Sequence, residues 1–360
     1  MNSKQVTILE NIVLAPYTTI YLGGNAKYFC TCTSVSEIQE AFEFARMHNL
    51  RLHILAGGSN TIFSDDGFDG LVVKIDCKGM SFTEDGNDIL ATVQAGEEWD
   101  KFVKMCVEKG YAGVECLSGI PGSVGATPIQ NVGAYGQEVK DTITTVKAID
   151  RSTLQEISFS TAECQFSYRQ SRFKSRDADK YIITEVTFRL MKNGTPTINY
   201  PEVKKIIEAS VPLSSLADGK ESLTAVRNVV LSLRKKKSMV IDPNDPNTKS
   251  VGSFFMNPIV DSDQLSVISK LWKKNGDGTE IPTFPFEDQV KIPAAWLIEK
   301  SGFKKGYTKN GVGISDNHTL ALVNRGGTTS ALLALAQEIQ HRVEQTFGIR
   351  LEIEPVIISK

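Results

Sequence analysis

The stretch "SGIPGSVGATPIQNVGAYG", residues 118–136, decides how this chain is interpreted. It contains five glycines and no charged residue, and Ala126 and Ala134 are the small neighbours of those glycines. So many small, uncharged residues indicate backbone packed directly against a large flat ligand, because a surface loop is normally more polar. A tightly packed internal turn is the alternative interpretation.

A second glycine segment, "LAGGSNTIF" at residues 55–63, follows a short apolar run. Glycines at the end of a strand permit a tight turn and let bare backbone amides approach a phosphate. No Gly-Lys-Ser/Thr follows and no GxGxxG is present, so this is neither a P-loop nor a Rossmann fingerprint. Alone it would be a plain turn, but the segment at 118–136 strengthens the ligand interpretation.

Composition limits the classes of protein that fit. The length of 360 residues predicts two or three domains, and 41% apolar with 23% charged residues indicates a globular chain rather than a disordered one. Lys and Arg total 40 against 42 acidic residues, for a net charge of -2. No overall field therefore attracts the protein to nucleic acid or to an anionic membrane.

Cysteine and histidine usage indicates a cytoplasmic protein without a metal site. The six cysteines include no CxxC and are expected to be reduced thiols rather than a disulfide framework. The four histidines lack metal-ligand spacing. The N-terminal residues show no signal-peptide pattern, and no stretch reaches the roughly 18 apolar residues of a membrane helix.

The first part of the chain has the pattern of a β-α-β unit. Ser34 and Glu37 have the spacing of a capping box, which predicts a helix start. Apolar residues at helical spacing follow: Ile38, Ala41, Phe42 and Ala45. The runs at 52–56 and 71–75 predict strands on either side of the first glycine segment.

Two further helices and a closing strand are expected. One helix has Trp99, Phe102, Val103 and Cys106 on its apolar side and ends at Gly110. Alternation between 140 and 190 predicts mixed β structure. The other helix ends at Gly348, with an apolar side made of Leu332, Leu335, Ala336, Ile339, Val343 and Phe347. A strand at 349–358 would place Glu352 and Glu354 on one face.

The stretch "VGSFFMNP", residues 251–258, places Ser253 and Asn257 on either side of Phe254 and Phe255. A polar group in dry surroundings costs about 1–3 kcal/mol unless it is paired. The hydroxyl and the amide therefore face either solvent or a ligand.

These segments in this order resemble the UDP-N-acetylenolpyruvoylglucosamine reductase (MurB) family of peptidoglycan synthesis. The resemblance covers nearly the whole chain. Beside GGSN and the 118–136 segment, it rests on CQFSYRQSRFK (164–174), GSFFMNP (252–258), AAWLIEKSGFKKG (294–306) and LEIEPVI (351–357).

The resemblance implies an FAD- and NADPH-dependent oxidoreductase. Reduced flavin N5 would deliver hydride to the enolpyruvyl group of the UDP-sugar, and a proton would complete UDP-N-acetylmuramate. Ser253 matches the family's proton donor, and Arg169 and Glu354 match its catalytic arginine and glutamate. Arginine suits a carboxylate. Taken singly, these residues would be a structural serine, a surface arginine and a solvent-facing acid, and Glu352 competes with Glu354.

The resemblance also implies binding residues. The residues expected to hold FAD are Gly57, Gly58, Ser59, Asn60, Gly119, Ile120, Pro121, Gly122, Gly125 and Ala126. Those expected at the substrate are Tyr135, Tyr168, Tyr200, Lys237 and Asn257. Tyr200 matches the loop tyrosine of the longer, type I enzymes. Lys237 has Lys235 and Lys236 beside it, and a solvated helix end is the alternative for all three.

The expected fold class is α+β, with a two-part FAD-binding region of the vanillyl-alcohol-oxidase (PCMH-like) type and a C-terminal α+β substrate-binding domain. The expected boundaries are 1–72, 73–215 and 216–345, followed by a closing strand at 346–360 that packs back toward the flavin. The segments at 201–222 and 274–289 match no family motif. A cytoplasmic monomer acting on a small UDP-sugar is expected.

Two other functions remain open. A flavin oxidase of the same superfamily would share the glycine segments without needing GSFFMNP or the closing glutamate. A nucleotide-sugar-binding regulatory protein would have lost the redox chemistry, which the presence of Arg169, Ser253 and Glu354 argues against.

Overall fold

The computed structural model describes residues 6–209 and 218–360. Backbone contacts divide the chain into two compact units. The larger unit takes its described residues from 1–12, 26–57 and 69–235, and the smaller unit from 13–25, 58–68 and 236–360. The chain therefore enters the smaller unit twice before residue 69. The division of the FAD-binding region at 72/73 stays a prediction.

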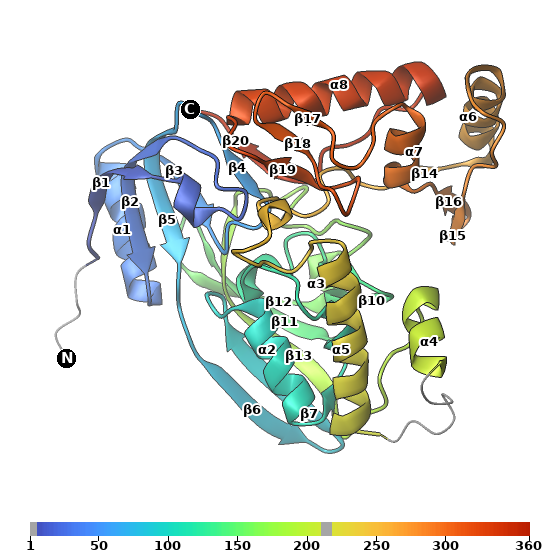
Figure 1. The fold of residues 1–360 in the computed structure, drawn as a ribbon. Coiled ribbons are helices and arrows are strands. Elements are labelled where there is room, and N and C mark those ends of the chain that lie inside the picture. Colours follow the sequence, from blue (N-terminus) through green and yellow to red (C-terminus); the bar gives the residue numbers. More distant parts are fainter. Residues whose placement is uncertain (1–5, 210–217) are drawn as a thin grey trace. The chain divides into compact units, whose positions relative to one another are not determined.

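The larger unit contains a four-stranded sheet with a helix beside it (Figure 1). Its strands, in spatial order, are β1 (Leu9–Val13), β2 (Asn25–Cys32), β5 (Phe68–Ile75) and β3 (Arg51–Leu55). Strands β3 and β5 are parallel, and α1 (Val35–Met47) begins at Ser34, whose hydroxyl accepts the Glu37 amide. The predicted helix and the two predicted strands are confirmed, although α1 precedes both strands of the parallel pair.

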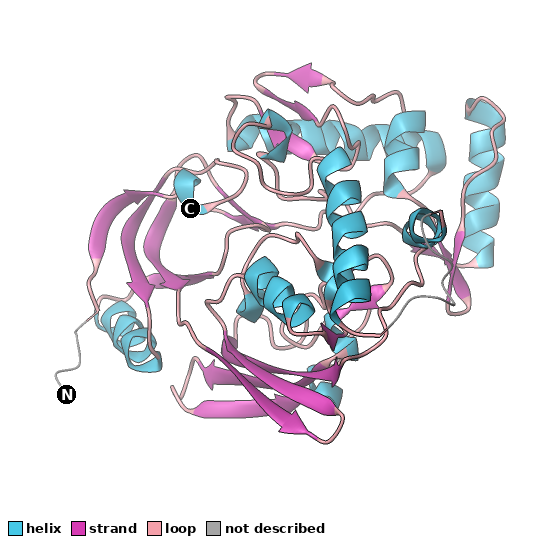
Figure 2. Ribbon diagram, turned by 60° about the horizontal axis from the view of Figure 1, so that its bottom comes forward, coloured by secondary structure: helices cyan, strands magenta, loops and turns pink. Residues whose placement is uncertain are grey.

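A second, antiparallel sheet of the larger unit forms a separate group of strands in Figure 2. Its strands, in spatial order, are β12 (Glu156–Ser160), β11 (Ile143–Asp150), β13 (Tyr181–Lys192), β7 (Asp88–Gln94) and β6 (Met80–Asp85), and β8 (Tyr111–Ala112) also pairs with β13. The helix α2 (Trp99–Glu108) packs on it, with the Phe102 and Phe188 rings 5.0 Å apart. The mixed β structure predicted for 140–190 is confirmed.

Three more helices complete the larger unit: α3 (Thr161–Cys164), α4 (Pro201–Glu208) and α5 (Lys220–Lys236). Buried side chains of α4 and α5 share one apolar cluster. Asp100 of α2 accepts two hydrogen bonds from Arg227 of α5, at 2.7 and 2.8 Å, which joins these two helices.

The smaller unit is built around the long helix α8 (Thr329–Phe347), shown in red in Figure 1. Its other helices are α6 (Ser262–Asn275) and α7 (Ala294–Lys300). Its short strands are β4 (Thr61–Phe63), β14 (Ile259–Val260), β15 (Phe284–Phe286), β16 (Gln289–Lys291), β17 (Thr308–Lys309), β18 (Val312–Ile314), β19 (Leu322–Asn324) and β20 (Val356–Ile358). The apolar residues predicted for α8 are all buried.

The closing strand is shorter than predicted. Only β20 (Val356–Ile358) is a strand, and it pairs in parallel with β4. Residues 349–355 were also expected to be extended, yet they pair only at Ile353, which bridges Phe255. The neighbour of this part of the chain is the irregular VGSFFMNP segment, so a continuous ladder cannot form.

Two other expectations can be checked directly. All six cysteines are free thiols, as predicted, and the structure places all of them in buried positions. No helix in the described part of the chain is long and apolar enough to cross a membrane.

Candidate active site

The glycine-rich segment at 118–136 packs backbone against backbone within the larger unit. A Cβ at Gly57 would lie 2.6 Å from the Gly122 Cα, and one at Gly125 would lie 2.5 Å from the Ala95 Cβ. Real Cβ atoms do not approach so closely, so these glycines are required by the fold itself. The tightly packed turn was one of the two interpretations, and it accounts for these two positions.

Polar groups of the same segment support the ligand interpretation as well. The Ser123 side chain is only 6% exposed, and its hydroxyl has no hydrogen-bond partner. Among the described residues, the amides of Ile120, Gly122 and Ser123 also have no protein acceptor. An unpaired buried donor such as the Ser123 hydroxyl costs about 1–3 kcal/mol, and its grouping with the half-buried amides suits an acceptor-rich ligand. The FAD diphosphate and flavin carbonyls have this chemistry, and the segment therefore fits FAD.

The remaining predicted FAD residues of this segment surround those donors. Gly119 has a φ of 72°, and its amide donates to the Asp100 carboxylate at 2.5 Å. Pro121 is half-buried, and Ala126 ends a short 3-10 helix at Val124–Ala126. The Gly119 amide is thus already used by the protein and is not available to a phosphate.

The GGSN motif is divided between the two units, since Gly57 belongs to the larger and Gly58 to the smaller. Gly58 has a φ of 65°, and its carbonyl accepts the Thr19 amide at 3.1 Å. A Cβ at Gly58 would lie 2.0 Å from the Tyr17 carbonyl oxygen, which excludes other residues. Ser59 is half-buried beside it.

Arg169 lies against the glycine-rich segment within the larger unit. Its Nη2 donates to the Gly133 carbonyl at 3.1 Å, and its guanidinium lies 5.6 Å from the centre of the Tyr168 ring. The φ of Arg169 is 53°, a left-handed conformation that costs a non-glycine residue about 1–3 kcal/mol. The structure therefore brings three predicted site elements together: Arg169, Tyr168 and the 118–136 segment.

Tyr135 and Tyr200 are also in contact. Their rings lie edge to face, with centres 5.2 Å apart. Tyr200 precedes α4 and is 39% exposed, whereas Tyr135 is half-buried. Burial raises the pKa of Tyr135 to about 12, although the nearby Arg234 acts in the opposite direction. Tyr135 therefore keeps its proton at neutral pH and can donate a hydrogen bond.

Ser253 lies in the smaller unit, where hydrogen bonds hold the backbone of the next residue, Phe254. The Phe254 amide donates to the Leu320 carbonyl at 2.8 Å, and the Phe254 carbonyl accepts the Glu354 amide at 3.0 Å. Gly252, directly before Ser253, has a φ of 76°. The Ser253 side chain is half-buried, and within the described part of the chain its hydroxyl makes no hydrogen bond. The backbone is fixed while the hydroxyl is available.

Glu354 is held beside the same segment by a residue predicted to bind FAD. The Asn60 carbonyl accepts the Val356 amide at 2.9 Å, and the Asn60 Nδ2 donates to the Glu354 carbonyl at 3.4 Å. These bonds give Asn60 a structural role in the smaller unit. Glu354 is half-buried whereas Glu352 is exposed, which favours Glu354 of the two candidates.

Asn257 and Lys237 have more ordinary surroundings. The Asn257 Oδ1 accepts the amide of Ala294, the first residue of α7, at 2.9 Å. Its oxygen therefore stabilises a helix start, which leaves the amide NH2 for a ligand. Lys237 is half-buried after the end of α5, whereas Lys235 and Lys236 are exposed.

Two family models match parts of this chain. The family model described as "FAD binding domain" matches residues 26–154, and "UDP-N-acetylenolpyruvoylglucosamine reductase, C-terminal domain" matches 243–358. The UDP-N-acetylenolpyruvoylglucosamine reductase of Thermobifida fusca is 45% identical over 359 residues, covering 97% of this chain and 98% of its own. That of Streptomyces coelicolor is 45% identical over 359 residues, covering 99% and 91%.

The chain belongs to the UDP-N-acetylenolpyruvoylglucosamine reductase family. The crystal structure of the Thermus caldophilus member superposes with a TM-score of 0.65 at 22% identity, covering 98% of this chain and 99% of that one. The predicted α+β fold class and the predicted FAD-binding region are confirmed.

Sequence reasoning missed Glu115 in this reductase-family chain. Its carboxylate is fully buried and accepts hydrogen bonds from the amides of Gly113 (2.8 Å) and Thr197 (2.7 Å) and from the Gln137 side chain (2.8 Å). It therefore joins the glycine-rich segment to the stretch leading to Tyr200. No sequence signal marked it, because two of its three donors, Gln137 and Thr197, lie far from it in the sequence.

Proposed function

We propose that the protein is an FAD- and NADPH-dependent UDP-N-acetylenolpyruvoylglucosamine reductase that converts the enolpyruvyl UDP-sugar to UDP-N-acetylmuramate in the cytoplasm, as a monomer. The observation that carries the proposal is the environment of the Ser253 hydroxyl. This hydroxyl makes no hydrogen bond within the described part of the chain, although the next residue is fixed on both sides by backbone bonds. A hydroxyl on a fixed backbone can donate its proton to a substrate that is bound beside it.

When bound, FAD supplies a hydride, obtained from NADPH, that adds to the terminal carbon of the enolpyruvyl double bond. The electron pair released toward the neighbouring carbon spreads into the substrate carboxylate. The Ser253 Oγ–H then donates its proton to that carbon, which completes the saturated lactyl ether. Phe254 and Phe255, both buried in the core of the smaller unit, keep the Ser253 backbone in place.

Arg169 and Glu354 act on the carboxylate side of the substrate in this proposal. The Arg169 guanidinium is already oriented by Gly133 and Tyr168, so it loses little freedom when it binds a carboxylate. Glu354 polarises the substrate carboxylate together with Arg169. FAD is held by the donors of Ile120, Gly122 and Ser123, assigned from their unpaired amides and hydroxyl.

In this proposal the UDP moiety binds residues that offer aromatic rings, positive charge and hydrogen-bond donors. Tyr135 and Tyr200 offer aromatic faces and a protonated phenol, and Lys237 offers charge to the phosphates. The Asn257 NH2 group is a further donor. In this proposal 1–72 and 73–215 contribute to FAD binding and 216–345 to substrate binding.

The test separates the two half-reactions without oxygen. The purified protein is expected to be yellow, to bleach with NADPH, and to regain its colour with the enolpyruvyl UDP-sugar. Ser253→Ala should bleach at nearly the same rate and reoxidise about 10² to 10⁴ times more slowly. Ser266→Ala, an exposed serine on α6, is the matched control.

Three results would reject parts of the proposal. A colourless protein favours a binding module without redox chemistry. A protein that stays bleached until air is admitted favours an oxidase. Equal loss in both half-reactions of Ser253→Ala would remove Ser253 from the role of proton donor.

A further inference from the structure

Residues 249–254, which include Ser253, run alongside residues 320–324 of the smaller unit. Before Ser253, the Lys249 carbonyl accepts the Asn324 amide at 3.0 Å, and Ser250 forms a bridge with Val323. After Ser253, the Phe254 amide donates to a carbonyl in the same stretch. The position of the hydroxyl therefore depends on how firmly residues 249–254 are held to this neighbour.

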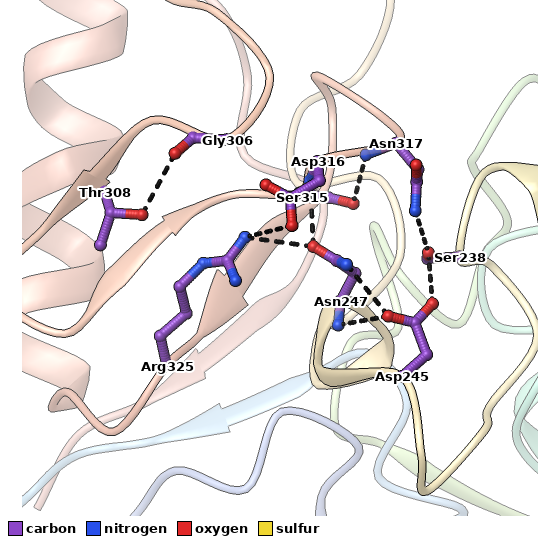
Figure 3. Close-up of polar contacts among 9 residues, drawn as sticks. All are labelled: Ser238, Asp245, Asn247, Gly306, Thr308, Ser315, Asp316, Asn317 and Arg325. Atoms are coloured by element: carbon purple, nitrogen blue, oxygen red, sulfur yellow. Dashed lines mark hydrogen bonds and ion pairs between the residues drawn. The ribbon is translucent and has the colours of Figure 1, made fainter.

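Figure 3 shows a connected set of polar side chains that includes Asn247, two residues before Lys249. The Arg325 Nη2 donates to the Asn247 Oδ1 and to the Asp316 carboxylate, each at 3.1 Å. The Asn247 Oδ1 also accepts the Asp316 amide at 3.0 Å. Asn247 is only 6% exposed, so both of these bonds are shielded from water.

The set continues to the end of α5. The Asp245 carboxylate accepts the Asn247 amide at 2.9 Å and the hydroxyl of Ser238 at 2.5 Å, and Asn317 donates to Ser238 at 2.9 Å. Burial works to raise the pKa of Asp245, but these bonds and the Asn247 side chain hold it below its ordinary value. Asp245 is therefore charged at neutral pH and fixes Asn247 from the side opposite Arg325.

We propose that Arg325 is a positioning residue for Ser253. The backbone amide of Asn324 holds Lys249, and the next side chain, Arg325, turns back to hold Asn247, two residues earlier in the same segment. One short stretch thus secures the segment at two points. Without the guanidinium, the Asn247 Oδ1 keeps only the Asp316 amide as a donor, and the Asp316 carboxylate loses its ion pair.

The consequence for catalysis follows from geometry. Proton donation is steeply sensitive to distance, and a displacement of about 1 Å can cost roughly a hundredfold in rate. Loss of Arg325 should therefore slow the step that uses Ser253 while leaving the NADPH step unchanged. This inference rests on the proposed function.

The experiment compares Arg325→Ala with Arg350→Ala in the FAD-loaded protein. Arg350 is an exposed arginine of the same unit that pairs with Glu344. We expect flavin reduction by NADPH to change less than about twofold in Arg325→Ala, and reoxidation by the enolpyruvyl UDP-sugar to slow by roughly ten- to a hundredfold. The solvent deuterium isotope effect on reoxidation should rise.

A second readout does not depend on activity. Amide hydrogen exchange in peptides covering 249–256 should be faster in Arg325→Ala and unchanged in Arg350→Ala. Arg325→Lys keeps the charge but cannot hold Asn247 and Asp316 with the same planar group, so it should show an intermediate effect in both measurements. Arg325→Lys also tests the proposal if Arg325→Ala does not fold.

The outcomes are separable. If wild-type protein is not reoxidised by the sugar, the proposed function fails and the role of Arg325 fails with it. If the wild type is reoxidised and Arg325→Ala slows both half-reactions equally, or neither, Arg325 is only a structural residue. Slower reoxidation without faster exchange at 249–256 would also overturn the positioning role.

Discussion

Replacing Glu115 with glutamine tests whether its buried carboxylate organises the larger unit. The carboxylate Oε1 accepts Gln137 and Thr197, and Oε2 accepts Gly113. A glutamine keeps the shape but turns one acceptor into a donor. If its nitrogen takes the Oε2 position, the Gly113 amide meets another donor and is left unsatisfied.

The magnitude follows from those bonds. An unsatisfied buried amide costs about 1–3 kcal/mol, and the two remaining bonds each lose about 1 kcal/mol when the acceptor is no longer charged. We expect Glu115→Gln to lower the free energy of unfolding of the larger unit by about 3–5 kcal/mol. Within the proposed function it should also raise the KM for the UDP-sugar, because Thr197 leads to Tyr200.

The assay is urea unfolding followed by tryptophan fluorescence. Trp99 reports on the larger unit, since its Nε1 donates to the Leu117 carbonyl next to Glu115, and Trp272 with Trp296 report on the smaller unit. Glu108→Gln, an exposed side chain of α2, should change stability by less than about 0.5 kcal/mol. A Glu115→Gln variant within about 1 kcal/mol of wild type would refute the assignment of three stabilising hydrogen bonds to this side chain.

Two further changes probe the glycine-rich segment and the α2–α5 pair. Gly125→Ala should lower the free energy of unfolding by about 1–3 kcal/mol and should lower the FAD content, because the added Cβ would overlap Ala95. Visible absorbance per mole of protein measures the FAD content. Burial works to raise the pKa of Asp100, but hydrogen bonds from Arg227 and Gly119 lower it overall. The stabilisation from Asp100 is therefore complete above about pH 4 and is lost as pH falls through the lowered pKa, so Asp100→Asn should flatten the acid side of the stability curve.

Matched variants separate these effects from general damage. Gly86→Ala introduces a left-handed alanine in open space, so it should cost stability without loss of FAD. Asp69→Asn removes an exposed ion pair with Lys27 and should leave the acid transition unchanged. Equal FAD loss in both glycine variants, or equal acid curves for Asp100→Asn and wild type, would contradict the reasoning.

Local patterns in the sequence predicted local structure well. The capping-box serine Ser34 begins α1, and the four apolar positions predicted for that helix are the four buried ones. Gly348 adopts a φ of 73° and ends α8 as predicted. Helix caps and the 3.6-residue period depend on neighbours in sequence, so they can be recognised without knowing the fold.

The sequence also predicted the residues of the candidate site, and the structure gives some of them a further, structural role. Asn60 was expected to bind FAD, and its amide and carbonyl are used to hold the closing segment. Asn257 was expected at the substrate, and its oxygen accepts the first amide of α7. A polar side chain has the same appearance in a sequence whether its partner is a ligand or a distant backbone group.

The amino-acid sequence by itself determined the family, the helices α1, α2 and α8 and the glycine segments, because these depend on ordered motifs and short-range periodicity. Only the tertiary structure decided which groups Glu115 and Arg325 contact, since Thr197 lies 82 residues from Glu115 and Asn247 lies 78 residues from Arg325. A buried charge is stable only where such donors or acceptors converge, and that convergence is a property of the folded backbone.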